Sequence, residues 1–299
     1  MDILAKEEIE RFLASPRVAG CPSTLRDGIK VVVLPKIDST NLYARALIAG
    51  AECPTTPTAV IADCQTAGRG RMGRRFDSPS GCGLYLSLVY RPCVAASANS
   101  GAGAAKWTAG AAVAVCRAVS KLFAVECGIK WVNDIFLNGK KICGILAEGV
   151  SGIETGALET IIVGIGVNVR LPPAGFAPEI RDIAGAITSL APPACPSRSQ
   201  LAAELIFQLL NVYENENFFD ILTEYKRRSI ILGQKIFVFP LAEGPSYAAE
   251  ALDIDQDANL IVRAADGEVM RLNSGEVKII PAEINNPPQS GRVFKPHCE

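Results

Sequence analysis

The chain has 299 residues, a length that suits one large domain and one smaller domain. Its 30 Lys and Arg residues and 31 Asp and Glu residues leave a net charge of -1, so we expect no general attraction to nucleic acid or to anionic membranes. The ten cysteines form no C-x-x-C pair and are expected to be reduced thiols, and His297 is the single histidine. This composition leaves almost no candidate base for a His-dependent nucleophilic centre, and it excludes a His-rich zinc site.

The sequence also bears on where the protein works. No apolar run reaches the roughly 20 residues that a membrane-spanning helix needs, and the charged opening MDILAKEEIE is not a signal peptide. We therefore expect a soluble, cytoplasmic protein without a membrane partner. Its chemistry is expected to depend on Lys, Arg, Asp and Asn side chains and on backbone amides.

The hydrophobic pattern up to about residue 232 predicts a mixture of strands and helices. Strands are expected at 31–37, 59–64, 84–90 and 159–169, and a strand–turn–strand unit around Asn138-Gly139 at 129–149. Helices are expected at 7–14, 42–49, 106–124, 199–215 and 218–231. A Pro-rich loop is expected at 171–197.

The pattern changes again at Gln234, where short β segments separated by turns begin and suit a small SH3-like barrel. We therefore expect four parts: an N-terminal extension at 1–29, a large domain at 30–232, an SH3-like domain at 233–284 and a polar tail at 285–299. The extension is too short for a winged-helix DNA-binding domain, so we expect no nucleic-acid partner.

The most informative segment is QTAGRGRMGRRF at 65–76, in which four Arg and three Gly fall within eight residues. Glycines let a polyanion approach the backbone, and arginines supply paired donors to phosphate or carboxylate. We expect this segment to be mobile until an anion neutralises its charge. A solvated basic turn explains the residues equally well, and the P-loop signature G-x-x-x-x-G-K-[ST] is absent.

A second group of residues combines Lys130, Asn133 and Asp134 with Lys141 and Gly144. The oxygens of Asn133 and Asp134 could hold Mg²⁺ or waters of a triphosphate, since magnesium accepts one or two such ligands beside its waters. The simpler alternative is a chain turn followed by an exposed hairpin lysine, and the residues alone leave both open.

Two weaker signals lie elsewhere in the chain. Gly164 and Gly166 interrupt an apolar strand, which indicates close approach either by a ligand or by packed protein. The Ser39-Thr40-Asn41 sequence either caps the following helix or binds a ligand.

Taken in order, these motifs resemble the biotin protein ligases. The motifs are DSTN at 38–41, QTAGRGRMGRRF at 65–76, KWVND at 130–134, KKICGILAE at 140–148 and GIGVNV at 164–169. The resemblance continues into the SH3-like domain, where 273–277 looks like the final strand of the family. Members usually carry Trp and Pro where this chain has Phe76 and Val132, and Phe76 lacks the indole N–H donor. Without a DNA-binding domain, the chain is similar to the monofunctional ligases.

The resemblance implies an α+β fold, with a mixed central β-sheet flanked by helices as in class II synthetases and a small C-terminal SH3-like barrel. It implies that biotin and ATP react to biotinyl-5′-AMP and pyrophosphate. Biotin would then pass to one lysine of a biotin carboxyl carrier domain. Mg²⁺ would accompany ATP, and the protein would be a monomer or a weak homodimer.

The resemblance also assigns residues. The biotin site would comprise Ser39, Thr40, Asn41, Gln65, Gly68, Arg69, Gly70, Arg71, Lys141, Gly144, Gly164 and Gly166. The ATP site would comprise Arg71, Arg74, Phe76, Lys130, Asn133, Asp134 and Asn168, with Asn133 and Asp134 also on the metal. Arg69, Arg71 and Lys141 would stabilise the charge that develops during catalysis. The loop at 66–76 would fold over the ligand and shield the anhydride from water.

Three other functions compete with this one. Lipoate–protein ligases share the catalytic fold, but they lack the dense Gly/Arg loop and the K-W-x-N-D arrangement. A biotin-sensing transcriptional regulator would need a DNA-binding element. An adaptor that docks partners through its SH3-like end would show no exchange of pyrophosphate with ATP.

Overall fold

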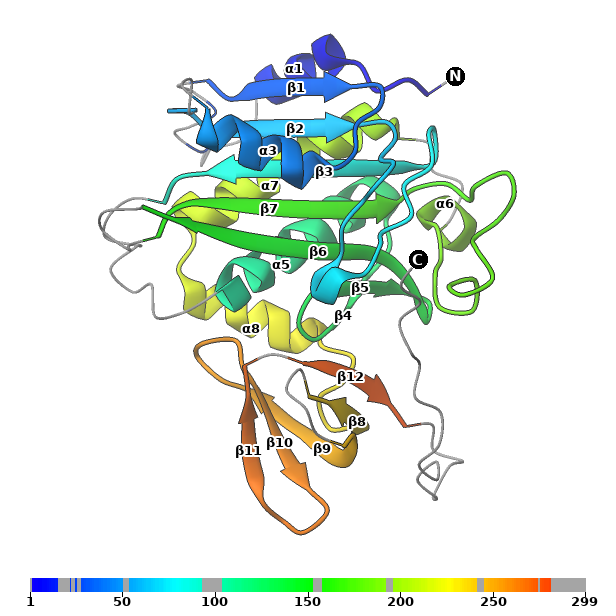
Figure 1. Cartoon of the computed structure of the whole chain (residues 1–299), viewed down its shortest axis with the longest axis vertical. Coiled ribbons are helices and arrows are strands. Elements are labelled where there is room, and N and C mark those ends of the chain that lie inside the picture. Colours follow the sequence, from blue (N-terminus) through cyan, green and yellow to red (C-terminus); the bar gives the residue numbers. More distant parts are fainter. Residues whose placement is uncertain are drawn as a thin grey trace.

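A seven-stranded sheet forms the centre of the molecule (Figure 1). The structure is a computed structural model, and it describes residues 2–15, 22, 25, 28–50, 54–92, 104–152, 158–191, 196–240, 245–273 and 275–280. The strands are β1 (Lys30–Leu34), β2 (Thr58–Ala62), β3 (Gly83–Tyr90), β4 (Gly128–Lys130), β5 (Asp134–Leu137), β6 (Lys140–Ser151) and β7 (Leu158–Asn168). Their order is β1-β2-β3-β7-β6-β5-β4; β1 and β2 are parallel, and the other neighbours are antiparallel. The mixed sheet that the family resemblance implied is therefore confirmed.

Strands β2 and β3 are buried along their whole length, which explains their continuous apolar sequences. One face of the sheet is covered by α5 (Ala104–Phe123), α7 (Arg198–Asn215) and α8 (Phe218–Arg228), while α3 (Thr40–Ala49) lies on the other (Figure 1). Gly110 of α5 allows α7 to pack closely, because a Cβ at this position would lie 3.0 Å from the Tyr213 ring. The main core therefore lies between the sheet and the three helices.

The helix α1 (Lys6–Ala14) packs against α7 and β1, and Leu4 and Ile9 belong to the main core. The expected N-terminal extension thus contributes directly to the packing of the large domain. How the chain divides into independent domains stays a prediction.

A second, antiparallel sheet follows the large domain (Figure 1). Its strands are β8 (Lys235–Phe239), β9 (Tyr247–Ile254), β10 (Leu260–Ala264), β11 (Val269–Leu272) and β12 (Glu276–Ile279), in the order β11-β10-β9-β8-β12. The Trp131 indole N–H donates to the Ala258 carbonyl at 2.9 Å, and Lys226 pairs with Asp253 at 2.7 Å, so the second sheet is joined to the first sheet and its helices. The predicted polar tail at 285–299 lies outside the described residues.

The predicted elements are found with shifted ends. The first strand ends at Leu34 rather than at residue 37, and α3 begins at Thr40. The Pro-rich loop contains the short helix α6 (Ile187–Leu190). None of the helices in the described ranges is both long enough and apolar enough to span a bilayer.

Candidate functional site

The segment from Gln65 to Ser78, which we call the Gly/Arg loop, connects β2 to β3 and crosses the sheet in front of β7 and β6 (Figure 1). Between this loop, the sheet and β12 lies a cavity of about 560 Å³. The Phe76 N–H donates to the Gly68 carbonyl at 2.9 Å and the Gly70 N–H to the Arg74 carbonyl at 2.7 Å. These bonds fold the loop into a narrow hairpin that ends in a short turn, η1 (Arg71–Gly73).

Acidic side chains from other elements offset the charge of the Gly/Arg loop. Arg74 forms an ion pair with Glu276 of β12, and Arg69 lies 3.8 Å from Glu148 of β6. Burial alone would raise the pKa of Glu276, but Arg74, together with Lys278 and Lys130, lowers it below its usual value. We expected repulsion among the arginines to loosen this segment; these carboxylates reduce that repulsion. Its mobility stays a prediction.

Uncharged polar side chains, one of them bonded to the carboxylate of Glu148, line one end of the cavity. Gln65 accepts a hydrogen bond from the Thr40 backbone N–H at 2.9 Å and donates to the Ser78 hydroxyl at 2.9 Å. The Asn41 amide donates to Glu148 at 2.7 Å and accepts from the Ser87 hydroxyl at 2.6 Å. These bonds hold the side chains in fixed orientations at the cavity wall.

Ser39 lies at the N-cap position of α3, which was one of the two roles considered for the DSTN motif. Its side chain makes no capping hydrogen bond to a described backbone group of that helix. Ser39 is among the residues that line the cavity.

Glycines in β6 and β7 make room for side chains of the protein. A Cβ at position 164 would lie 2.1 Å from the Asn41 amide oxygen, and a Cβ at position 166 would lie 2.5 Å from the Phe76 ring. Gly144 pairs with Gly166 in the ladder, and a Cβ there would also contact Phe76, at 3.4 Å. The close approach that the sequence indicated at these glycines is therefore made by packed side chains.

Gly68 has a different reason to be glycine. A Cβ at this position would lie 2.4 Å from the Phe76 carbonyl oxygen and 2.8 Å from the Ser78 hydroxyl, so the turn of the loop itself requires glycine. Gly68 does not line the cavity. All the other residues that were predicted to bind biotin or ATP do line it.

The opposite end of the cavity carries charged groups. The Lys141 amine lies 2.7 Å from an Asp134 carboxylate oxygen, and Arg71 donates to the Asn133 amide oxygen at 3.1 Å. Burial lowers the pKa of Lys130 and of Arg71, and the negative charge of Asp134 partly offsets this effect at both. Cations outnumber carboxylates here, so this end of the cavity suits an anion with several charges.

The two residues predicted to hold magnesium differ in what they can offer. The amide oxygen of Asn133 accepts from Arg71, and its amide nitrogen donates to the Ile145 carbonyl at 3.1 Å, so Asn133 does not fit a metal. Of the two residues, Asp134 alone offers a carboxylate, the kind of ligand that magnesium takes, and its Oδ1 is ion-paired with the Lys141 amine at 2.7 Å. Within those residues, no three His, Cys, Asp or Glu side chains form a metal-binding group.

The sequence analysis missed four parts of this site: Glu148, Glu276, Lys278 and the loop at 176–184. Glu148 and Glu276 both occur in motifs that we quoted, but their ion pairs with distant arginines depend on the fold. Lys278 of β12 and residues of the loop at 176–184 also line the cavity. Neither carries a local pattern that predicts this position.

Comparisons with known proteins agree with this geometry. The model of the biotin/lipoate A/B protein ligase family matches residues 33–168. The chain is 37% identical over 176 residues to "Bifunctional ligase/repressor BirA" of Bacillus subtilis, which covers 56% of this chain and 51% of that protein. It thus spans about half the length of that relative. It is 31% identical over 254 residues to the biotin--[acetyl-CoA-carboxylase] ligase of Mycobacterium tuberculosis, which covers 82% of this chain and 87% of that protein.

A solved structure shows the same fold. The biotin protein ligase from Aquifex aeolicus in complex with biotin and ATP superposes with a TM-score of 0.66 at 24% identity. The match covers 84% of this chain and 98% of that one. From the fold, the cavity and these relatives together, the chain belongs to the biotin protein ligases of the biotin/lipoate A/B protein ligase family.

Proposed function

We propose that the protein is a biotin–protein ligase, which activates biotin with ATP and transfers it to a lysine of a biotin carboxyl carrier domain. One observation carries this proposal: the cavity beside the Gly/Arg loop has one end lined by the uncharged side chains of Ser39, Thr40, Asn41 and Gln65 and another end where cations outnumber carboxylates. A ligand that fits both ends would combine a neutral hydrogen-bonding ring with a polyanion. Biotin joined to the phosphate of ATP has this character.

The polar end would hold the ureido ring of biotin. A cyclic urea needs paired donors and acceptors, and Ser39, Thr40, Asn41 and Gln65 supply hydroxyl and amide groups of both kinds. Because hydrogen bonds already orient Thr40, Asn41 and Gln65, binding would cost little side-chain entropy.

The first reaction would take place between the two ends of the cavity. An oxygen of the biotin carboxylate attacks the α-phosphorus of ATP, a new P–O bond forms, and the bond to pyrophosphate breaks. Two anions must approach each other, so Arg69, Arg71 and Lys141 would stabilise the charge that accumulates on the phosphoryl oxygens. In the second reaction the amine of the carrier lysine attacks the acyl carbon, and AMP leaves.

The remaining predicted residues would bind ATP. Lys130 and Arg74 would contact phosphates, Asn168 would reach the adenosine half, and Phe76 would supply an aromatic surface. Mg²⁺ bound with ATP would neutralise part of the phosphate charge, and Asp134 would be its protein ligand. The folded Gly/Arg loop would exclude water from the mixed anhydride.

The cellular setting follows from this reaction. The carrier domain is the expected macromolecular partner, and the reaction is expected in the cytoplasm. Whether the protein acts as a monomer or a weak homodimer is likewise an expectation from the sequence.

An exchange assay between ATP and labelled pyrophosphate tests the proposal. We expect exchange that depends on biotin and Mg²⁺ and that is absent with lipoate. Exchange with lipoate alone would instead indicate the lipoate branch of the family. A lack of exchange with either acid, in protein that is folded by circular dichroism, would refute the proposed activity.

A further inference from the structure

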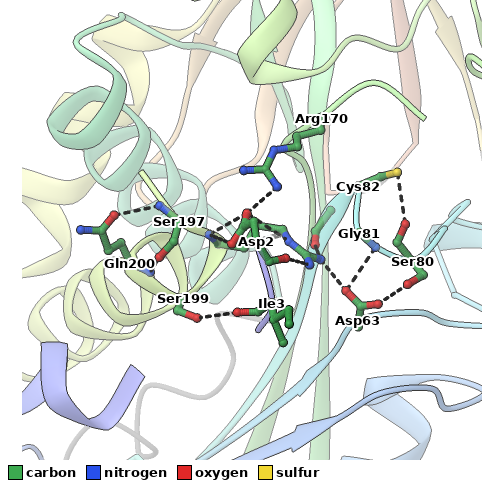
Figure 2. Close-up of polar contacts among 12 residues, drawn as sticks. Asp2, Ile3, Asp63, Ser80, Gly81, Cys82, Arg170, Ser197, Ser199 and Gln200 are labelled. Carbon is green, nitrogen blue, oxygen red and sulfur yellow. Dashed lines mark hydrogen bonds and ion pairs between the residues drawn. The ribbon is translucent and has the colours of Figure 1, made fainter. Parts of the chain in front are cut away.

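Arg198, at the start of α7, is a buried charged side chain, with 2% of its surface exposed. Figure 2 labels its acidic partners Asp2 and Asp63 together with residues that bond to them. Its guanidinium donates to the Asp63 carboxylate at 2.6 Å, to the Gly83 carbonyl at 3.0 Å and to the Asp2 carbonyl at 2.7 Å. Burying a cation is costly unless it is paired and hydrogen-bonded, so these partners account for its position.

The partners of Arg198 lie at both ends of the Gly/Arg loop. Asp63 directly follows β2 and comes two residues before Gln65. Gly83 begins β3, five residues after Ser78. The Asp63 carboxylate also accepts from the Gly81 N–H at 3.2 Å and from the Ser80 hydroxyl (Figure 2). One buried guanidinium therefore joins the two points at which the loop leaves the sheet.

A third strand that borders the cavity is tied to the same cluster. Arg170 pairs with the Asp2 carboxylate at 2.6 Å, and its backbone N–H donates to the Cys82 carbonyl at 2.7 Å. Asn168, which lines the cavity at the end of β7, lies two residues before Arg170. Asp2 also accepts from the Arg198 backbone N–H at 3.2 Å, so the N-terminal segment bridges both arginines.

We infer that Arg198 is a positioning residue of the ligase: by joining Asp63 to Gly83, it fixes how the Gly/Arg loop crosses the sheet and where its arginines meet the ligand. Asp2 completes this cluster. The β2–β3 ladder ends at the pair Ala62–Tyr85, and the bonds of Arg198 extend this constraint to Asp63 and Gly83, so the loop has fewer conformations available. Because reacting groups must be placed within about 1 Å, fixing the ends of the loop contributes to catalysis without contact with substrate.

A second arginine cluster in the molecule serves as the control. Arg117 of α5 bonds to Glu216 and Glu224, and so ties three helical segments together on the opposite face of the sheet. It is also partly buried and has two acidic partners, but it has no contact with the Gly/Arg loop among the described residues. Arg117→Lys therefore measures the effect of losing a structural arginine alone.

The test compares Arg198→Lys with Arg117→Lys. Lysine retains the charge but loses the planar fork of donors, so it cannot hold Asp63, Gly83 and Asp2 together. The ligand-free proteins are treated with trypsin well below both melting temperatures, and cleavage after the arginines at 69–75 is followed by mass spectrometry. We expect cleavage in the loop to be about tenfold faster in Arg198→Lys and unchanged in Arg117→Lys. We also expect kcat/KM for biotin-dependent exchange to fall about tenfold in Arg198→Lys alone.

Equal rates of loop cleavage in the two variants would overturn the inference, whatever their melting temperatures. If Arg198→Lys does not fold, Asp2→Asn takes its place, with the same expected direction and a smaller effect. The kinetic part rests on the proposed function, whereas the cleavage part does not. Absence of exchange in the unmodified protein would remove the proposed activity and leave the positioning role to be decided by cleavage.

Discussion

The two faces of the central sheet have different neighbours. In β7, Val163, Ile165 and Val167 belong to the large core under α5 and α7, whereas Gly164 and Gly166 alternate with them and face Asn41 and Phe76. On the α3 side the buried apolar cluster consists of Ala44, Val60, Val89 and Ile162. Most of the buried apolar packing therefore lies on the face covered by α5, α7 and α8. The cavity lies on the α3 face, where apolar packing is sparse. The following predictions test this separation, beginning with the largest expected effect.

Truncation on the helix-covered face should change stability and leave ligand binding intact. Leu209 of α7 is fully buried, and Leu209→Ala should lower the free energy of unfolding by about 2–5 kcal/mol, because it removes apolar contacts and leaves a cavity. Urea unfolding measures this loss. A KM for biotin or ATP that rises in the folded variant would show that the two faces are coupled.

Removing a positive charge that lines the cavity should lower the activity and leave the stability nearly unchanged. Lys141→Ala should reduce biotin-dependent pyrophosphate exchange by about 100-fold, because a positioned cation near the reacting phosphate is removed. Its effect on the melting temperature should be small. Lys140→Ala is the matched control, since Lys140 bonds to the Asp182 carbonyl at 2.7 Å and does not line the cavity. Similar exchange rates in both variants would exclude Lys141 from the reaction.

The glycines allow a comparison of one added methyl group on each face. Gly166→Ala should displace the Phe76 ring and lower kcat/KM about tenfold, with little change in stability. Gly110→Ala crowds Tyr213 and Val212 and should cost about 1–3 kcal/mol of stability at unchanged kcat/KM. Exchange kinetics measure kcat/KM and urea unfolding measures the stability of both variants. The separation of the faces is wrong if Gly110→Ala is the variant that loses activity.

The smallest effect concerns the ion pair between the Gly/Arg loop and β12. The pKa of Glu276 is depressed in the folded protein, so its pairing with Arg74 stabilises the fold above the usual value of 4.5 and loses this effect as the pH falls through the folded pKa. Glu276→Gln should therefore cost less than about 1 kcal/mol at pH 7, since Arg74 is largely exposed, and still less below pH 4. Urea unfolding at several pH values measures the difference. A cost that grows on acidification would contradict this assignment.

Local patterns in the sequence were sufficient to predict much of the fold. The Asn138-Gly139 turn adopts positive φ at both residues, as a two-residue hairpin requires, and it joins β5 to β6 where the sequence predicted. The alternation of apolar residues and glycine in β7 also indicated that something approaches the strand closely. That the approaching groups are Asn41 and Phe76 depends on how distant segments pack, and no local pattern contains this information.

The candidate site was predicted from the order of its motifs. The residues whose roles this prediction missed or assigned differently were hard to predict for physical reasons. Gly68 belongs to a conspicuous Gly/Arg segment, but its role is to let the loop turn beside the Phe76 carbonyl. Glu148 and Glu276 bind arginines more than 70 residues away in the chain, and such ion pairs leave no periodic signal. The same holds for Arg198, whose partners come from three separate regions.

The ion pair between Arg74 and Glu276 makes the second sheet a part of the wall that closes over the ligand. Any rotation of that sheet relative to the first would stretch this pair and lift the loop. If the proposed ligand binds under this loop, occupancy of the cavity and the angle between the two sheets would be thermodynamically linked. Linkage is reciprocal, so a carrier domain that favours one angle on docking would change the affinity for the activated vitamin by the same factor by which that ligand changes the affinity for the carrier.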